Sequence, residues 1–137
     1  MAGIGIAERA AGNAELLRRG YEAFARNDGA ALTELFHERM VWHAQRLGQL
    51  GGDHVGRDAV FAFFARTMEL TGGTFRVEPQ EILANDDGAA AVVRSTAARL
   101  GRRLDSRQVH QFHVRDGRVV EVWQFVDDAT VVDAFWS

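Results

Sequence analysis

Residues 107–126 read RQVHQFHVRDGRVVEVWQFV, and this segment is the most informative about the fold. Asp116-Gly117 is a two-residue turn signal between two runs rich in β-branched and aromatic residues, which predicts a hairpin of the strands Arg107–Arg115 and Arg118–Val126. Both faces of the second strand carry apolar side chains, whereas a sheet with one face in water alternates between apolar and polar residues. The apolar residues of the two faces are Val119, Trp123 and Phe125, and Val120, Val122 and Val126. The hairpin therefore predicts a sheet that is covered on both sides.

Three helices are expected upstream of the hairpin. They begin near Asn13, Ala31 and Asp58, where apolar residues recur at helical spacing, and Asn13 is a plausible N-cap. Between the second and the third helix, residues 41–43 are expected to form a short strand. The glycine-rich segment 46–56 is expected to be a loop.

Two further strands, Thr74–Leu83 and Ala89–Arg99, are expected between the last helix and the hairpin. Helices first and antiparallel strands second is the order of an α+β fold. The chain length predicts one domain over residues 1–137, with residues 1–12 loosely ordered.

Composition limits the functional classes. The net charge of -3 gives no electrostatic reason to expect nucleic acid as a partner, and no apolar run approaches the roughly 18 residues of a membrane span. The first residues lack a basic segment, so we expect no signal peptide. The chain has no cysteine, which excludes disulfides and thiol catalysis. A cytoplasmic protein without a cofactor is the expectation, since the sequence contains neither GxGxxG nor a phosphate loop.

The order of several short motifs resembles the SnoaL-like members of the nuclear-transport-factor-like superfamily. This superfamily also contains ketosteroid isomerases, limonene epoxide hydrolase and scytalone dehydratase. The resemblance runs from about Asn13 to the end of the chain. The matching segments are YEAF at 21–24, LF at 35–36, VWH at 41–43, GRDAV at 56–60, FF at 63–64, FHVRDGRV at 112–119 and EVW at 121–123.

The resemblance implies a cystatin-like cone. In such a cone a curved antiparallel sheet wraps around the N-terminal helices, a pocket lies inside, and the convex face of the sheet forms a homodimer. The hairpin with two apolar faces agrees with this expectation. The same fold hosts many chemistries, so the activity depends on the residues of the pocket.

His110 is the first candidate catalytic residue. It lies in the middle of a strand, with Phe112 on its face by the two-residue period. The resemblance places it where SnoaL-type polyketide cyclases keep a pocket histidine, and where ketosteroid isomerases hold a protonated aspartate that donates to the substrate oxyanion. A histidine can also donate there. The alternative is a core histidine that a backbone carbonyl or a neighbouring side chain satisfies.

Gln124 is the second candidate, and it departs from the family. The cyclases have Glu-His-Trp-Asp in this strand with the aspartate as acid and base, whereas residues 121–124 here read EVWQ. An amide takes up no proton at neutral pH, so Gln124 either orients a carbonyl or a water or is simply part of the pocket wall. A type I′ turn at residues 116–117 would set His110 opposite Trp123. A G1 bulge, which the family pattern favours, would set it opposite Val122 and diagonal to Gln124.

Two more positions follow from the isomerases. Their general-base aspartate falls near His43 or Ala44, so His43 is a candidate base, since histidine titrates near neutrality. Strand alternation equally allows His43 to face outward, away from the face of Trp42 and Ala44. The tyrosine of these enzymes falls near Gly20 or Tyr21, which places Tyr21 in the expected pocket.

Arg94 is a candidate pocket arginine by resemblance to limonene epoxide hydrolase, which activates water with an Asp-Arg-Asp arrangement. The alternative is an ion pair with Glu121 or Glu81 on the convex face. No metal site is expected, because the histidines at positions 37, 43, 54, 110 and 113 show no ligand spacing. The other residues expected to bind the substrate are Tyr21, Phe24, Trp42, Phe61, Phe64, Phe112 and Val122.

The sequence thus predicts a pocket for a small, hydrophobic, oxygenated molecule. The candidate reactions are isomerisation, dehydration or hydration, and cyclisation by proton transfer. The alternative is a non-catalytic ligand-binding or accessory protein of the same fold. If the pocket holds no titratable group other than His110, acid–base catalysis becomes hard to support.

Overall fold

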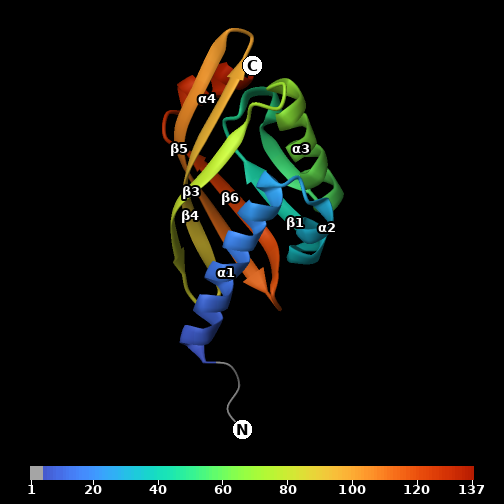
Figure 1. Ribbon diagram of the computed structural model, residues 1–137, viewed down its shortest axis with the longest axis vertical. Coiled ribbons are helices and arrows are strands. Elements are labelled where there is room, and N and C mark those ends of the chain that lie inside the picture. The colour runs from blue at the N-terminus through green and yellow to red at the C-terminus, as the bar shows by residue number, and fades with distance from the viewer. Residues whose placement is uncertain (1–4) are drawn as a thin grey trace.

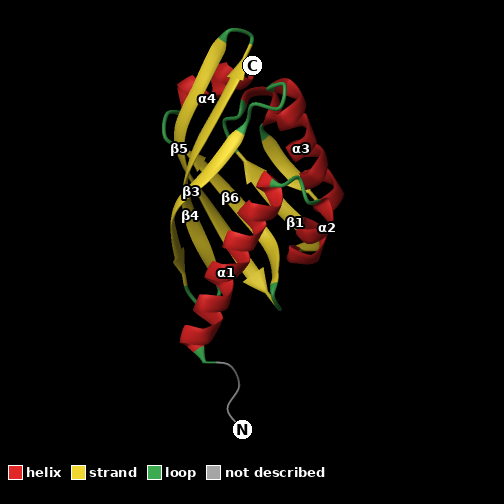
Figure 2. Ribbon diagram, in the orientation of Figure 1, coloured by secondary structure: helices red, strands yellow, loops and turns green. Residues whose placement is uncertain are grey.

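The computed structural model describes residues 5–137, which form four α-helices and one six-stranded sheet (Figures 1 and 2). The helices are α1 (Ile6–Ala25), α2 (Gly29–Leu35), α3 (Arg57–Leu70) and α4 (Ala129–Trp136), with a short 3-10 helix η1 (Gly48–Leu50). The strands are β1 (Phe36–Ala44), β2 (Gly52–Val55), β3 (Arg76–Ala84), β4 (Gly88–Arg99), β5 (Arg102–Arg115) and β6 (Arg118–Val126). The expected α+β fold is confirmed.

The sheet has the strand order β2-β1-β6-β5-β4-β3 and curves around the helices (Figure 1). Helix α1 lies along β3 and β4, while α3 covers β1 and β2. All neighbouring strands are antiparallel except β1 and β6, which are parallel. The expected antiparallel arrangement therefore holds for every neighbouring pair of strands in the described chain except this one. None of the described helices is long and apolar enough to cross a membrane.

Strand β5 shows how the sheet divides into two faces. Its residues from Leu104 to Phe112 alternate strictly between buried and exposed side chains. We call the side that carries Leu104, His110 and Phe112 the inner face, and the opposite side the outer face. The inner face packs toward the helices and holds the core of the protein.

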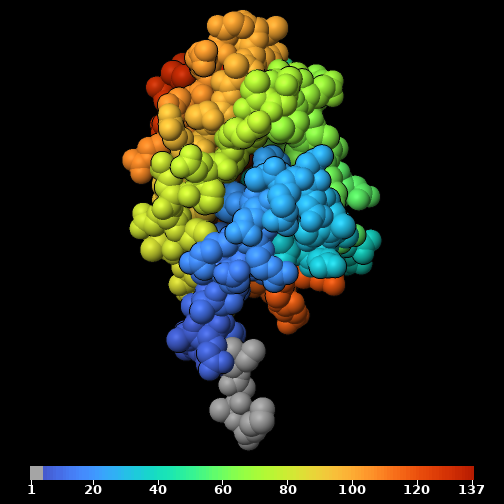
Figure 3. Space-filling model, viewed as in Figure 1, coloured from blue at the N-terminus to red at the C-terminus, as the bar shows by residue number. Residues whose placement is uncertain are grey.

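Helix α1 begins at Ile6 rather than at Asn13. Residues 6–12 contain good helix formers and no proline, so the helix continues upstream of the expected cap. Asn13 is instead buried inside the helix, where its side-chain amide donates to the carbonyl of Asn85 at 2.8 Å. The exposed first turns project beyond the sheet in Figure 3. The expectation of loose order is wrong for residues 6–12, and residues 1–4 lie outside the described residues.

The segment between α2 and α3 contains more structure than expected. The short predicted strand is the end of a nine-residue strand, β1, which begins directly after α2 at Phe36. The segment expected to be a loop contains η1 and β2, and β2 pairs antiparallel with residues 41–44 of β1. The C-terminal helix α4 was not expected either. Asp128 caps it by accepting from the amide of Val131 at 3.1 Å, and Phe135 and Trp136 are buried.

The β5–β6 hairpin has a register that neither alternative describes. Asp116 and Gly117 have φ values of +52° and +74°, as a type I′ turn requires. The pairing then shifts by one residue, because Val114 faces Val119 while His113 faces Glu121. Val120 is therefore an extra residue in a β-bulge.

The charge of Glu121 gives a physical reason for the bulge. In an unbroken ladder from this turn, Glu121 would lie opposite Phe112 and its carboxylate would face the apolar interior, which is costly. The bulge keeps Glu121 on the outer face and brings Val122 to the inner face opposite Phe112, where it is completely buried. It also sets Gln124 directly opposite His110.

Candidate functional site

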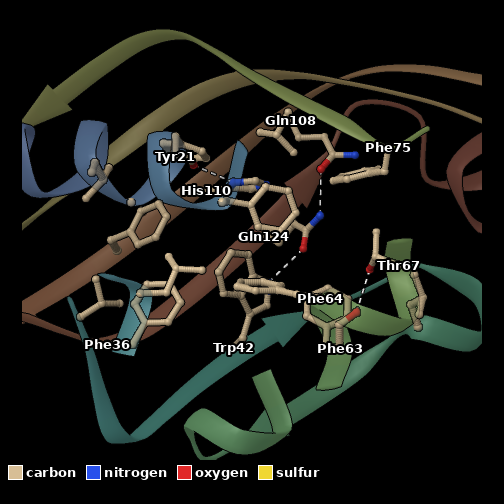
Figure 4. A pocket seen from close by; sticks show the side chains of 18 of the residues that line it. Tyr21, Phe36, Trp42, Phe63, Phe64, Thr67, Phe75, Gln108, His110 and Gln124 are labelled. Atoms are coloured by element: carbon tan, nitrogen blue, oxygen red, sulfur yellow. Dashed lines mark hydrogen bonds between the residues drawn. The ribbon is translucent and has the colours of Figure 1, made fainter. Parts of the chain in front are cut away.

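A cavity lies between the inner face of the sheet and helices α1, α2 and α3 (Figure 4). The volume that the centre of a water-sized sphere can occupy in this cavity is about 80 Å³. A single water molecule needs only about 10–15 Å³ of this volume. The wall is almost entirely apolar, and its polar side chains other than the two tryptophans, Trp42 and Trp136, are Tyr21, Thr67, Gln108, His110 and Gln124. No Asp, Glu, Lys or Arg from residues 5–137 lines it. The cavity therefore suits an uncharged organic molecule.

The local fold places three of these polar residues side by side. Gln108 and His110 are two residues apart on β5, so both point inward. The bulge brings Gln124 of β6 directly across from His110. Facing residues on neighbouring strands have Cβ atoms roughly 5 Å apart, which makes these side chains immediate neighbours in Figure 4.

His110 forms a pair with Tyr21 of α1. The Tyr21 hydroxyl lies 2.8 Å from Nδ1 of His110. Burial lowers the pKa of His110 from 6.5 to about 4, and it raises the pKa of the Tyr21 hydroxyl. Both side chains are therefore neutral at pH 7, and the pair offers hydrogen bonds rather than charge.

The other ring nitrogen of His110, Nε2, is buried and has no hydrogen-bond partner among the described residues. Leaving a buried polar group unpaired costs about 1–3 kcal/mol. His110 lines the cavity, and a ligand that reaches this nitrogen from the cavity would recover the lost hydrogen-bonding energy. The only other buried side-chain atom of this kind in residues 5–137 is Oγ of Ser95, which does not line the cavity.

Gln124 belongs to a chain of hydrogen bonds that leads from the cavity to the surface. Trp42 Nε1 donates to Gln124 Oε1 at 3.0 Å, and Gln124 Nε2 donates to Gln108 Oε1 at 2.8 Å. Gln108 Nε2 lies 3.4 Å from Ser106 Oγ, which donates to Oδ1 of Asp127 at 2.7 Å. An indole N–H can only donate and a carboxylate can only accept, so the two ends fix the orientation of both amides between them.

His43 lies on the outer face, as its alternative orientation allows. Its Nδ1 is 2.7 Å from Asp53 Oδ1, its Nε2 is 2.6 Å from Glu121 Oε2, and its ring stacks on Trp123. The hydrogen bonds to Glu121 and then Asp53 raise the pKa of His43. Both nitrogens point at carboxylates, which favours an imidazolium without a lone pair for a metal. No group suited to a metal ion is found in residues 5–137.

Arg94 also lies outside the cavity, so its assignment to the pocket is wrong. It is exposed on the outer face and binds Asp105 through two bonds of 2.8 and 2.7 Å. The alternative of an ion pair on the convex face describes its position correctly, but the partner is Asp105 rather than Glu121 or Glu81. Strand parity explains this position, because the buried inner-face residues of β4 are at positions 91, 93, 95 and 97, and Arg94 has the opposite parity.

Among the residues expected to bind substrate, five line the cavity: Tyr21, Phe24, Trp42, Phe64 and Phe112. Phe61 and Val122 do not. Phe61 packs on Phe36 and Phe64, and Val122 is completely buried opposite Trp42 in the sheet. The catalytic role of His110 and Gln124 remains a prediction, whereas His43 has no access to the cavity from the outer face.

Several wall residues were missed in the sequence. Gln108 lies two residues before His110 in the same strand. The two-residue period of a strand therefore predicts that both side chains point to the same face. Leu47 and Leu50 belong to the segment expected to be a loop, and Trp136 comes from the helix α4 that was not expected. No pattern in the sequence indicates that these three residues reach the same cavity.

Comparison with known proteins supports the family. The family model of the SnoaL-like domain matches residues 17–122. An uncharacterized protein of Mycobacterium tuberculosis is 34% identical over 124 residues, which are 90% of this chain and 95% of that protein. The solved structure of Bal32a from a soil-derived mobile gene cassette is 42% identical and has a TM-score of 0.91 over 94% of this chain and 99% of its own.

A nuclear-transport-factor-2-like protein from Burkholderia xenovorans shares the fold. It is 20% identical, with a TM-score of 0.81 over 93% of this chain and 98% of its own. This likeness concerns the arrangement of helices and strands alone. From the domain match and these similarities together, the chain belongs to the SnoaL-like domain family and has the nuclear-transport-factor-like fold.

Proposed function

We propose that the cavity binds a small, uncharged, mainly apolar organic molecule that carries at least one oxygen. One observation carries this proposal: an apolar cavity whose wall holds a neutral, paired His110 with an unpartnered Nε2. A charged ligand would lose its hydration without gaining a counter-charge from the wall. An apolar body with one polar group matches the wall best.

Gly20 offers a test of this function. It lies on α1 in the cavity wall, and a Cβ built there meets no atom within 4 Å. Gly20→Leu fills part of the cavity, and the helix is expected to tolerate it because leucine is the better helix former. Gly12→Leu is the matched control, since Gly12 is exposed on the same helix and does not line the cavity.

The measurement begins with a thermal-shift screen of uncharged one- and two-ring compounds, followed by calorimetric titration of those that bind. We expect Gly20→Leu to weaken binding at least about tenfold, and Gly12→Leu to bind as the wild type does. The proposal is overturned if no compound binds, or if Gly20→Leu binds as tightly as the wild type.

Proton-transfer catalysis is the second candidate function. The displaced pKa of His110 within a cavity favours it, because such groups cluster at functional sites. Against it, a histidine whose pKa is about 4 is a weak base at pH 7. The cavity wall of the described chain holds no carboxylate to assist. Tyr21 is the only other titratable wall residue, and it too is neutral, so binding without chemistry is better supported.

Exchange of α-protons separates the two candidates without knowledge of the natural ligand. 1-Indanone in D₂O is incubated with the wild type or with His110→Phe, and deuterium uptake is followed by NMR. We expect the wild type to exchange these protons no faster than buffer does. A faster exchange that His110→Phe abolishes would establish proton transfer and displace the non-catalytic function.

An apolar row on the outer face supports the further proposal of a homodimer. Val92, Val109 and Phe125 are successive partners across β4, β5 and β6, and Val109 and Phe125 are 36 % and 54 % exposed. Charged groups of both signs flank this apolar row, among them the Arg94–Asp105 pair. A second copy related by a two-fold axis can cover the row and match those charges.

Phe125→Asp tests the dimer by light scattering after gel filtration. We expect the wild type to have the mass of two chains and Phe125→Asp the mass of one. Leu100→Asp is the control, because Leu100 is 79 % exposed in the β4–β5 turn, away from the apolar row. A monomeric wild type, or a dimeric Phe125→Asp, contradicts this assembly.

A further inference from the structure

We propose that Tyr21 fixes His110 as the tautomer with its proton on Nε2, so that the cavity selects ligands with a hydrogen-bond acceptor oxygen, such as ketones. Ligands that offer only a donor are disfavoured. This inference rests on the proposed small-molecule function and names the ligand class. Tyr21 is a positioning residue in this scheme, because it acts on the ligand through His110.

Counting hydrogen bonds distinguishes the two neutral tautomers. If the Tyr21 hydroxyl donates to Nδ1, only the Nε2–H group is left without a partner. If Nδ1 carries the proton and donates to Tyr21, the tyrosine hydroxyl hydrogen and the Nε2 lone pair are both left unpaired. A buried arrangement with one unpaired group is more stable than one with two. The first tautomer is therefore favoured.

The protonated imidazolium, in which both nitrogens donate, does not compete at neutral pH. His110 is 4 % exposed and has no carboxylate partner, and burial holds its pKa at about 4. The unpaired group in the cavity wall is thus a neutral N–H donor. A neutral donor matches a carbonyl or ether oxygen. It supplies no positive charge that would make an ionised carboxylate ligand bind more tightly than the protonated acid.

Gln124 does not supply the missing acceptor. It lies directly opposite His110, but its oxygen accepts from Trp42 and its nitrogen donates to Gln108. Turning the amide to aim its oxygen at Nε2 breaks both bonds and sets the amide N–H against the Trp42 N–H. The hydrogen-bond chain that ends at Asp127 therefore leaves Nε2–H without a partner among the described residues.

Three bicyclic probes of similar size test the selection. Indene has no polar group, 1-indanone has only an acceptor, and indole has only a conventional donor. For the wild type we expect calorimetry to show 1-indanone binding about tenfold more tightly than indene, the effect of one well-made hydrogen bond. Indole is expected to bind no more tightly than indene, because the N–H of indole would face the Nε2–H of His110, and two donors cannot form a hydrogen bond.

Tyr21→Phe removes the hydroxyl that fixes the tautomer of His110 and keeps the aromatic ring at position 21. With Nδ1 free of the hydroxyl, His110 can present either a donor or an acceptor at Nε2. We expect the preference for 1-indanone over indole to fall from about tenfold to about threefold or less. Ser95→Ala is the matched control, since it removes a buried hydroxyl outside the cavity wall and is expected to keep the full preference.

Nitrogen-15 NMR of the histidine side chains reads the tautomer directly and without a ligand. In the wild type we expect a protonated Nε2 and an unprotonated Nδ1 for His110, and a mixture of the two tautomers in Tyr21→Phe. A protonated Nδ1 in the wild type, or an unchanged probe preference in Tyr21→Phe, overturns the inference. Binding of indene without any preference for 1-indanone overturns it too, but leaves the small-molecule function standing. If none of the three probes binds, that function fails together with the selection.

Discussion

His110 and His43 lie on opposite faces of the same sheet and have opposite electrostatics. On the inner face, only uncharged side chains surround His110, most of them apolar, so burial dominates and lowers its pKa to about 4. On the outer face, two carboxylates bond His43 while its side chain stays 23 % exposed, so hydrogen bonding dominates and raises its pKa. Strand parity alone decides which environment a histidine enters. Residue type therefore says little about chemistry until the face is known.

The two tryptophans that accompany these histidines give the largest expected effect. Trp42 is 6 % exposed and packs on Phe63 and Phe64 inside, whereas Trp123 stacks on His43 outside. We expect Trp42→Ala to lower the free energy of unfolding by about 3–5 kcal/mol and Trp123→Ala by about 1 kcal/mol. Urea unfolding in the Phe125→Asp background measures both changes without a contribution from dimer dissociation. Equal losses of unfolding free energy in the two variants would show that the inner and outer faces contribute equally to stability.

Acid should destabilise the protein through His110. Between pH 6.5 and about 4 the unfolded chain binds a proton that the folded His110 does not, so stability falls as the pH drops. At pH 5 the expected loss is about 2 kcal/mol relative to pH 7. Urea unfolding of the wild type and of His110→Phe at both pH values isolates this term. If both proteins lose the same stability between these pH values, His110 is not the buried neutral group described above.

His43 should show the opposite slope and a smaller effect. Its pKa is raised on folding, so its stabilisation is fully present below its unfolded pKa of about 6.5 and is lost as the pH rises through the folded value. Because the three side chains are partly exposed to solvent, we expect only about 0.5–1 kcal/mol. The difference in unfolding free energy between wild type and His43→Gln should shrink from pH 6 to pH 9. A difference that stays constant would show that His43 is not stabilised as a cation.

Much of the fold was predictable from local patterns. The Asp116-Gly117 turn and the order of helices before strands indicate the hairpin and the α+β class correctly, whereas only the family resemblance implies the curvature of the sheet. Helix α4 was missed because its eight residues are too few for a clear helical period. The parallel pairing of β1 with β6 joins segments about 80 residues apart, and no local signal encodes it.

The candidate site was predictable only in part, for a related reason. The two-residue alternation along β5 places His110 on the inner face. The same alternation along β4 would have placed Arg94 on the outer face. The hydrogen bond between Tyr21 and His110 spans 89 positions and depends on how α1 crosses the sheet. The facing of His110 and Gln124 depends on a one-residue bulge, which alternation in a strand with two apolar faces does not specify.

Val120 and its bulge have a consequence for how the chain avoids misfolding. The competing hairpin, slipped by one residue, would exchange Gln124 for Trp123 opposite His110 and block the cavity with an indole. That hairpin also turns the carboxylate of Glu121 toward the apolar interior, where no Lys or Arg of the described residues lines the cavity. Burying this unpaired carboxylate costs free energy, so Glu121 disfavours the slipped hairpin whether or not a ligand is bound.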